Sequence, residues 1–388
     1  MRVLLFLTPP DARGATASGV MRYLYELKSA MGPEVEYLYL DPPSPHAATA
    51  AEQANATPIP KRRRYLPASL ALLLGFMRDT WRQSRRMRVY RDKVDLIHVV
   101  AAGCEIHNLA ARLAGFKHIL STVQALPSDE PYAMHWVRRL IEYSSFHAAH
   151  RYIVVTDATA AGWHARARLD RGRTVTIFNA MRQPDYTGYD RAAYRTRLGV
   201  PPGAFVIGIC ARLHRMKGHF VLLESYKKIL AKQNKAKPEV LLLLAGEGPE
   251  RAAIERKIAE LDIGDHVRMI GHWDDPVGFA GAIDLNVLPS IEMETIGYQN
   301  IEAMFAGVPS VVSDYGGMKE IIEPSGGGLV VPAGDSAALA AAILHYIQDP
   351  AAALHAGTAA LAYAKANLTA DIMARKTMAV YKEIQSRE

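Results

Sequence analysis

The sequence predicts an α/β protein of two doubly wound domains, each with a parallel sheet covered by helices. Its 388 residues suffice for two domains that each bury a core. In both halves, short runs rich in leucine and β-branched residues alternate with longer segments of helical period. Between the halves, residues 181–203 concentrate Pro, Gly and Asp, as linkers do. We therefore expect a first domain over 1–180, a linker over 181–203 and a second domain over 204–368.

Each half contains six predicted strands, which are short apolar runs bounded by turn residues. In the first half they are 3–7, 35–40, 95–100, 118–123, 152–156 and 175–178; in the second half they are 205–210, 240–245, 266–270, 285–288, 310–313 and 329–331. A last helix is expected in the tail 369–388, after a stop at Asp349-Pro350. Periodicity leaves open whether this helix caps the second domain or crosses back to the first.

Composition narrows the class of protein. Hydrophobic residues make up 49% of the chain, and two cysteines, Cys104 and Cys210, are too few for a disulfide scaffold. No stretch reaches the roughly 18–20 consecutive apolar residues of a membrane-spanning helix. The apolar start of the chain is short and is followed by two prolines and an Asp, which favours a first strand over a signal peptide. We expect a cytoplasmic protein.

The formal charge of +7 comes from one segment. Residues 1–180 carry 24 basic and 15 acidic side chains, and 61–93 alone carries 11 basic and 2 acidic ones. On a helical wheel this segment forms an apolar stripe flanked by arginines. The stripe consists of Leu70, Leu73, Leu74, Met77 and Trp81, and the flank of Arg78, Arg82, Arg85 and Arg86.

Three interpretations of this basic segment compete. It is a core helix with solvated arginines, a nucleic-acid-binding helix, or an interfacial helix on anionic lipid. No nucleic-acid-binding motif accompanies it, so nucleic acid is not an expected partner. We favour a mixture, in which part of the stripe packs on the fold and the arginines face a membrane or an anionic, lipid-diphosphate-linked acceptor.

Two cations mark a strand-to-helix turn in the second half. Arg212 and Lys217 precede Gly218, and a helix is expected to start at about Lys217. Positive charge, free helix N–H groups and a glycine together suit a diphosphate. A solvent-exposed loop of basic residues, without a ligand, accounts for the same sequence pattern equally well.

A glycine pair, Gly246 and Gly248, follows the next leucine-rich strand. It matches half of a dinucleotide-binding fingerprint, but the third glycine is absent. Pro249 is expected as the first residue of a helix. We favour a tight strand-to-helix turn beside a ligand crevice over a nicotinamide-dinucleotide site.

The most specific motif holds two glutamates, Glu294 and Glu302, around the start of a predicted helix near Gln299. At the carboxyl end of a strand, such carboxylates can accept hydrogen bonds from sugar hydroxyls. The N–H groups at Gly297 and Tyr298 would face phosphate. The alternative is that both glutamates only favour the helix N-terminus electrostatically.

Taken together, these motifs resemble the nucleotide-sugar-binding domain of GT-B glycosyltransferases of the retaining family four. The matching text is ARLHRMKG, LLLAGEGPE, VRMIGHWDD, LPSIEMETIGYQNIEAMFAGVPSVVSDYGGMKEIIE and GGLVVPAGD, in the family's order over residues 205–349. The first half resembles the acceptor domain more loosely, through MRVLLFLTPP, SGVMRYLYEL, DLIHVV and VTIFNAM. The resemblance implies two Rossmann-like domains facing across a cleft, with the tail helix crossing back onto the first.

The resemblance also implies roles for single residues. Catalytic roles fall on Arg212 and Lys217, which would hold the diphosphate, and on Glu294, which would contact the transferred sugar. The loop before Glu294 is one residue longer than the commonest form, which makes Glu292 its rival. The remaining donor-binding positions are Glu302 at the ribose, Gly19 at the phosphates, Met269 and Gly271 at the base, and Gly246, Gly297 and Tyr298 in the surrounding loops.

Two residues are acceptor-side candidates. His98 is expected at the end of its strand, with a satisfied core histidine as the alternative. Gln124 stands where the family often has a histidine; it can hydrogen-bond a hydroxyl but cannot act as a general base. No Asp-x-Asp pair and no metal-ligand spacing occur, so we expect no metal and no cofactor.

The implied activity is transfer of a sugar from a UDP-, GDP- or ADP-type donor to a hydroxyl of a glycan or lipid-linked acceptor, with retained anomeric configuration. Such an activity would serve bacterial-type synthesis of cell-surface polysaccharide or glycolipid, on the inner face of the membrane. Two alternatives stay open: a GT-B-shaped sugar-nucleotide epimerase, and a non-catalytic GT-B scaffold or nucleic-acid-binding protein that uses the basic helix 61–93. Donor base, acceptor identity and oligomeric state are left open.

Overall fold

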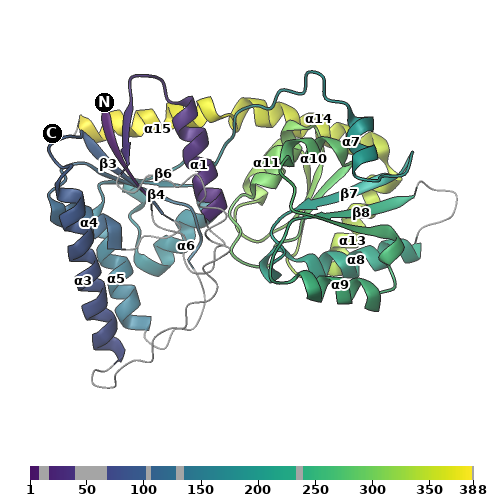
Figure 1. Ribbon diagram of the computed structural model, residues 1–388, viewed down its shortest axis with the longest axis horizontal. Coiled ribbons are helices and arrows are strands. Elements are labelled where there is room, and N and C mark those ends of the chain that lie inside the picture. The colour runs from purple at the N-terminus through teal and green to yellow at the C-terminus, as the bar shows by residue number, and fades with distance from the viewer. Residues whose placement is uncertain (8–16, 40–67, 102–105, 128–134, 233–238, 387–388) are drawn as a thin grey trace. The chain divides into compact units, whose positions relative to one another are not determined.

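The computed structural model describes residues 1–7, 17–39, 68–101, 106–127, 135–232 and 239–386 (Figure 1). Contacts divide the chain into two compact units. Unit 1 is Met1–Asn179 with Ala370–Glu388, and unit 2 is Ala180–Thr369. Each unit contains one parallel sheet of six strands.

Unit 1 has the strand order β2-β1-β3-β4-β5-β6. Its strands are β1 (Arg2–Leu7), β2 (Glu36–Tyr39), β3 (Leu96–Ala101), β4 (Ile119–Val123), β5 (Arg151–Val154) and β6 (Thr174–Thr176). Its helices are α1 (Ala17–Ala30), α3 (Ala68–Arg88), α4 (Ile106–Ala114), α5 (His135–Ala148), α6 (Asp157–Ala167), the 3-10 turn η1 (Arg171–Arg173) and the final α15 (Ala370–Gln385).

Unit 2 has the strand order β12-β11-β10-β7-β8-β9. Its strands are β7 (Phe205–Cys210), β8 (Val240–Ala245), β9 (Val267–Gly271), β10 (Leu285–Leu288), β11 (Ser310–Ser313) and β12 (Gly328–Val331). Its helices are α7 (Arg191–Arg197), α8 (His219–Lys232), α9 (Arg251–Glu260), α10 (Pro276–Ala282), α11 (Tyr298–Phe305), α12 (Lys319–Ser325), α13 (Ser336–Gln348) and α14 (Pro350–Asn367), with 3-10 turns η2 (Arg215–Lys217) and η3 (Gly264–His266).

The predicted fold class is confirmed. Every predicted strand overlaps a strand of the structure, and four of them, β7, β8, β10 and β11, match at both ends. All paired strands are parallel, and the strand order changes direction at β1 and at β7, as in doubly wound sheets. Helix α9 begins at Arg251, so the prediction that Pro249 opens this helix was wrong by two residues.

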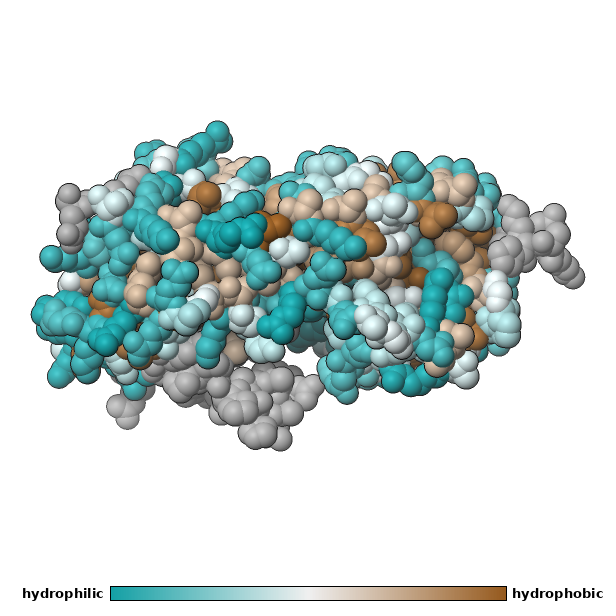
Figure 2. All heavy atoms as spheres, turned by 90° about the horizontal axis from the view of Figure 1, so that it is seen from above, coloured by the Kyte–Doolittle hydropathy of each residue, from teal (hydrophilic) through white to brown (hydrophobic). Residues whose placement is uncertain are grey.

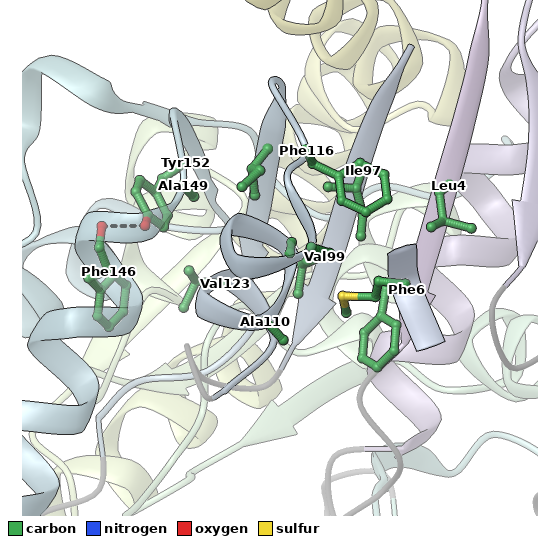
Figure 3. Packing of buried hydrophobic residues seen from close by; sticks show 14 of the residues in the cluster. Leu4, Phe6, Ile97, Val99, Ala110, Phe116, Val123, Phe146, Ala149 and Tyr152 are labelled. Carbon is green, nitrogen blue, oxygen red and sulfur yellow. Dashed lines mark hydrogen bonds between the residues drawn. The ribbon is translucent and has the colours of Figure 1, made fainter. Parts of the chain in front are cut away.

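The core of unit 1 lies between its sheet and the helices α4, α5 and α6 (Figure 3). Leu4, Ile97 and Val123 come from three neighbouring strands and are fully buried. Tyr152 also lies in this core and donates its hydroxyl hydrogen to the Phe146 carbonyl, so its polar atom is satisfied. Unit 2 has its own core, which includes Leu243 and Phe279.

The segment 181–203, for which the sequence predicts a linker, includes α7 of unit 2. Asp190 caps this helix by accepting a hydrogen bond from the Ala193 N–H. Arg191 and Arg195 form ion pairs with Asp284 at 2.6 and 2.5 Å, which hold α7 against the sheet. The Pro, Gly and Asp residues of this segment thus surround a short docked helix.

Helix α15, the last element of the chain, packs against α1 in unit 1. Its Glu383 pairs with Arg151 of β5 at 2.8 Å. Thus the tail belongs by contacts to the same unit as the first strands, although the periodicity of the sequence left its position open.

The surface seen in Figure 2 mixes hydrophilic side chains with smaller apolar areas. Among the described helices, no single one has the length and apolar content needed to cross a membrane. The pair α13 and α14, bent by 101° at their junction, passes that test together by length and composition only.

Candidate functional site

The candidate site of unit 2 lies where the strand order of its sheet reverses, between β7 and β10. The chain continues from β7 to β8 on one side, and β10 pairs with β7 on the other. In doubly wound proteins, ligands bind at the carboxyl ends of such neighbouring strands. Here the two loops are joined by a hydrogen bond from the Ile291 N–H to the Met216 carbonyl, at 2.8 Å.

Gly218 explains why these two loops approach so closely. It has φ +73°, and a Cβ there would stand 1.9 Å from the Pro289 carbonyl oxygen. Helix α8 therefore starts against the backbone of the β10 loop, one residue after Gly218. The helix start expected at about Lys217 is the end of η2, which His214 caps by accepting the Met216 N–H at 3.4 Å.

Lys217 and Glu294, one from each loop, form an ion pair with an Nζ–Oε2 distance of 2.5 Å. Ser290 donates its hydroxyl hydrogen to the same carboxylate oxygen, at 3.2 Å. The Glu294 side chain is only 8% exposed. A fixed cation and a fixed carboxylate thus meet at the reversal of the strand order.

Glu292, the rival of Glu294, lies elsewhere. Its side chain is 40% exposed and pairs with Arg215 at 3.1 Å. Met293, between the two glutamates, has φ +47°, a left-handed conformation that non-glycine residues rarely adopt. The structure therefore brings Glu294, and not Glu292, to Lys217.

The loop after β8 packs directly on the loop after β7, and its glycines are required for that contact. A Cβ at Gly246 would lie 2.0 Å from the Ala211 carbonyl oxygen, and one at Gly248 2.3 Å from that of Leu213. The Gly246 N–H also donates to the Gly271 carbonyl at 2.7 Å. The glycine pair is thus a tight turn between β7 and β9, as we favoured. It places Gly271, with half-buried Met269 nearby on β9, beside the β7 loop.

Glu302 is buried in the second turn of α11, one turn later than expected. The helix begins at Tyr298, after Gly297, whose φ is +69° and whose Cβ would lie 2.6 Å from the Leu288 side chain. Burial raises the pKa of Tyr186, and the charge of Glu302 adds to this effect, so the two side chains are near each other. Sequence reasoning missed Tyr186, because it stands in the segment expected to be a linker.

A buried cluster of amide side chains fixes the start of α11, and sequence reasoning missed it too. Gln299 accepts the Cys210 N–H of β7 at 3.1 Å and donates to Asn286 of β10 at 2.5 Å. Asn286 in turn donates to Asn300 at 2.9 Å. These bonds tie α11, and with it Glu302, to the two strands beside the reversal. The one feature of the sequence that could have indicated this cluster is the asparagine inside the apolar run of β10, Asn286.

Two further residues lie in the same segment of the chain as Lys217. Arg212 is half-buried after β7, and its charge adds to burial in lowering the pKa of His214. His219, the first residue of α8, is buried; burial, followed by the charge of Lys217, lowers its pKa to about 4. His219 is thus a neutral ring at this helix start, which no motif pointed to.

In unit 1, the acceptor-side candidate His98 is the third residue of β3 and not its end, because the strand continues to Ala101. Its ring is fully buried. Nδ1 lies 2.8 Å from the Tyr381 hydroxyl of α15, and Nε2 lies 2.7 Å from the Thr122 hydroxyl of β4. Both nitrogens are therefore occupied by the fold, as in the core histidine that we kept as the alternative.

Gln124 follows β4 and is buried. Its Oε1 accepts a hydrogen bond from Asn179 at 3.0 Å. The remaining polar atoms of the pair, Gln124 Nε2 and Asn179 Oδ1, are buried and have no hydrogen-bond partner within the described residues. Leaving such an atom unpaired costs about 1–3 kcal/mol, so a polar ligand group there would be favoured.

Gly19 belongs to the first turn of α1. A Cβ at this position would meet no atom of the described residues within 4 Å, so packing among them does not require the glycine.

The four arginines of the basic segment, Arg78, Arg82, Arg85 and Arg86, lie exposed on α3. Of the predicted stripe, of which we expected a part to pack on the fold, Leu74, Met77 and Trp81 are exposed and Leu73 is half-buried. Instead, α3 packs through its Thr80, Ser84 and Met87 face. The side chain of Leu70 and the tetrabasic start of the segment lie outside the described residues.

A cavity of about 680 Å³ lies at the amino ends of strands β3 and β4 of unit 1. Its lining includes Asp95 and His118, which precede β3 and β4.

Within the described ranges, no three His, Cys, Asp or Glu side chains converge as metal ligands would. The metal-independent site stays a prediction.

Two family models match the chain in succession. One, for Glycosyltransferase Family 4, matches residues 17–181, and the other, for Glycosyl transferases group 1, matches residues 190–362.

Two curated relatives illustrate the similarity. A GDP-mannose-dependent monoacylated alpha-(1-6)-phosphatidylinositol monomannoside mannosyltransferase of Corynebacterium glutamicum is 27% identical over 198 residues, 49% of this chain and 50% of the relative. The lipopolysaccharide core biosynthesis glycosyltransferase LpsD of Rhizobium meliloti is 32% identical over 157 residues, 40% of this chain and 43% of the relative. The chain thus spans about half the length of these relatives.

Solved structures share the fold over the whole chain. Anabaena HepE in complex with UDP has a TM-score of 0.75 at 19% identity, covering 99% of this chain and 100% of that one. A sucrose-phosphate synthase from Thermosynechococcus elongatus has a TM-score of 0.72 at 22% identity, covering all of both chains. With both family models matched in order on two parallel six-stranded sheets, the chain belongs to the family of glycosyl transferases group 1 and glycosyltransferase family 4, which has the GT-B fold.

Proposed function

We propose that the protein is a retaining glycosyltransferase that moves a sugar from a nucleotide-diphosphate donor to a hydroxyl of a glycan or lipid-linked acceptor. The observation that carries the proposal is the Lys217–Glu294 pair at the reversal of the unit 2 sheet. A diphosphate and a sugar require opposite partners, a cation and a hydrogen-bond acceptor, and these two side chains provide both. When the donor binds, the ion pair between Lys217 and Glu294 is replaced by bonds to the donor. Lys217 then binds the diphosphate, and Glu294 accepts hydrogen bonds from the sugar hydroxyls.

The other site residues complete this assignment. Arg212 and the N-terminal N–H groups of α8 hold the diphosphate together with Lys217. Glu302 accepts the ribose hydroxyls. The base lies against Met269 and Gly271 of β9, beside the turn at Gly246. Gly297 and Tyr298 contribute N–H groups at the start of α11. The approach of the Gly19 backbone to phosphate stays a prediction.

Retention follows from a front-face route. The bond from the sugar C1 to the diphosphate oxygen breaks, and the acceptor oxygen bonds to C1 on the same face. The leaving phosphate takes the acceptor proton, and fixed cations offset its growing charge. This route needs no protonatable side chain, so it tolerates Gln124. The Gln124 Nε2 group, which has no partner among the described residues, supports a hydrogen bond to a hydroxyl of the substrate.

The acceptor is a glycan or a lipid-linked saccharide of cell-surface polysaccharide or glycolipid synthesis, used at the cytoplasmic face of a membrane. The names of the two curated relatives, which refer to a phosphatidylinositol mannoside and to lipopolysaccharide core, support this class.

The donor base can be identified by ligand-induced stabilisation. We expect one of UDP, GDP or ADP to raise the midpoint of thermal unfolding well above the others. A ligand at 100 times its Kd adds about 2.7 kcal/mol to the free energy of unfolding. Differential scanning fluorimetry with the three diphosphates and their sugars measures this. If none stabilises the protein, the donor site is wrong.

Glu302→Gln tests the ribose contact. Losing a charge-assisted hydrogen bond costs about 1.5–3 kcal/mol, so the KM for the donor should rise about tenfold or more while kcat changes little. In the wild type, a 2′-deoxyribose donor should suffer a similar loss; in the variant it should suffer little further loss. The control is Glu323→Gln on the exposed part of α12, which should behave like the wild type. Equal discrimination between ribose and deoxyribose in both proteins would remove Glu302 from the ribose site.

A further inference from the structure

Helix α3 exposes three large apolar side chains to the surface. Leu74, Met77 and Trp81 are 46%, 57% and 59% exposed, whereas Met87 is buried. On the inner side, Thr80 and Ser84 are buried, although both are small and polar. A helix that faces only water buries its apolar stripe and exposes its polar one. The outer stripe of α3 is therefore built for a medium other than water.

The outer stripe is flanked by positive charge. Helix α3 contains five arginines and a single acid, Asp79, which Arg78 binds at 3.0 Å. Arg82 and Arg86 are exposed, and the Arg85 guanidinium lies over the Trp81 ring, 4.9 Å from its centre. Apolar side chains that include a tryptophan, beside a row of arginines, match the boundary between the acyl chains and the anionic headgroups of a bilayer.

Helix α5 contacts α3 (Figure 1), and it also exposes large apolar side chains. Its Leu140 is 51% and its Tyr143 42% exposed, next to exposed Arg139. Exposed apolar residues on a water-soluble surface occur singly, so their recurrence on two contacting helices marks an interaction site.

We propose that the outer faces of α3 and α5 dock on an anionic lipid surface, with Leu74, Met77 and Trp81 inserted between headgroups and Arg82, Arg85 and Arg86 against lipid phosphates. Charge selects this occupant. A second copy docked through the same face would bring two arginine rows together, and a nucleic acid would leave the apolar stripe in water. The purpose of this contact, which is to bring unit 1 to a lipid-linked acceptor, rests on the proposed function. The lipid contact itself does not depend on the proposed function.

The test is co-sedimentation of the full chain with vesicles of phosphatidylcholine alone or of an equimolar mixture with phosphatidylglycerol. We expect the wild type to bind the anionic vesicles only, and less at high salt. Arg82→Gln, Arg85→Gln and Arg86→Gln together should weaken partition about 100-fold, because each basic residue near the surface contributes about fivefold. The pair Met77→Ser and Trp81→Ser should weaken it about tenfold or more.

The matched control for charge is Lys227→Gln, Lys232→Gln and Arg256→Gln, which removes three exposed cations from α8 and α9 of unit 2. Leu354→Ser on α14 is the control for an exposed apolar side chain. Both should bind vesicles like the wild type. Equal loss in the controls, equal binding to neutral and anionic vesicles, or no vesicle binding by the wild type would overturn the proposal. So would a wild-type dimer, seen by analytical ultracentrifugation, that the Met77→Ser, Trp81→Ser pair dissociates.

Nucleotide-diphosphate stabilisation, measured on the same proteins, separates this proposal from the proposed function. Loss of vesicle binding with intact nucleotide stabilisation in the α3 variants confirms the docking surface. Vesicle binding by a wild type that no nucleotide stabilises retains the surface and overturns the glycosyltransferase site alone.

Discussion

Lys217→Ala should lower kcat/KM about 10²- to 10³-fold, the loss expected when one fixed group that stabilises developing charge is removed. The Lys217 ammonium group is the cation that the structure places against Glu294 at the strand reversal. In the proposed reaction it faces a diphosphate whose charge grows as the bond to the sugar breaks. The loss should therefore fall more on kcat than on the KM for the donor. Steady-state kinetics with the donor identified by stabilisation measures both.

Arg215→Ala is the matched control, because Arg215 lies two residues earlier in the same turn and pairs with exposed Glu292. It should retain near-normal kinetics, since exposed ion pairs contribute little. Lys217→Ala also leaves the buried Glu294 carboxylate without its partner, so unfolding must be compared in parallel. Lys217→Arg keeps the charge and should recover part of the activity. Near-normal turnover of a folded Lys217→Ala protein would exclude the site.

The position of the unit 2 candidate residues was largely predictable, because they follow strand ends. In a parallel sheet, loops that follow neighbouring strands meet at one edge, so Lys217 after β7 and Glu294 after β10 could be paired from their positions alone. The choice between Glu292 and Glu294 needed the structure, since both stand in one short loop and only the backbone turn at Met293 separates them. The amide cluster around Asn286 was not predictable, because hydrogen bonds between side chains far apart in sequence leave no periodic signal.

Unit 1 was harder to predict for a different physical reason. The helical wheel of α3 correctly separates Met77 and Trp81 from Thr80 and Ser84, but it cannot say which side the neighbouring helix covers. Hydrophobicity predicted burial of part of the stripe, but the face that packs on α4 is the one with Thr80 and Ser84. For His98, the strand was correct and the role depended on Tyr381, which arrives 283 residues later on α15.

Acidification should destabilise unit 1 through His98. Burial lowers the pKa of this ring to about 3, from an ordinary value of 6.5 that applies when the chain is unfolded. Below pH 6.5 the unfolded state therefore binds a proton that the folded state does not bind, so the free energy of unfolding falls as the pH falls. The slope approaches about 1.4 kcal/mol per pH unit for this one group, which gives a loss of about 2 kcal/mol at pH 5. The contribution stops growing near pH 3, where the folded state also binds the proton.

His98→Gln isolates this effect, because glutamine can hydrogen-bond the Tyr381 and Thr122 hydroxyls but does not titrate. The variant should be less stable than the wild type at pH 7 and should lose less stability between pH 7 and pH 5. Hydrogen exchange in peptides from β3 and α15, corrected for intrinsic rates, reads the opening of unit 1 directly. His272→Gln removes a histidine on an exposed loop and should leave the pH profile unchanged. If His98→Gln and wild type lose stability in parallel on acidification, the buried ring is not the group that links the packing of α15 to pH.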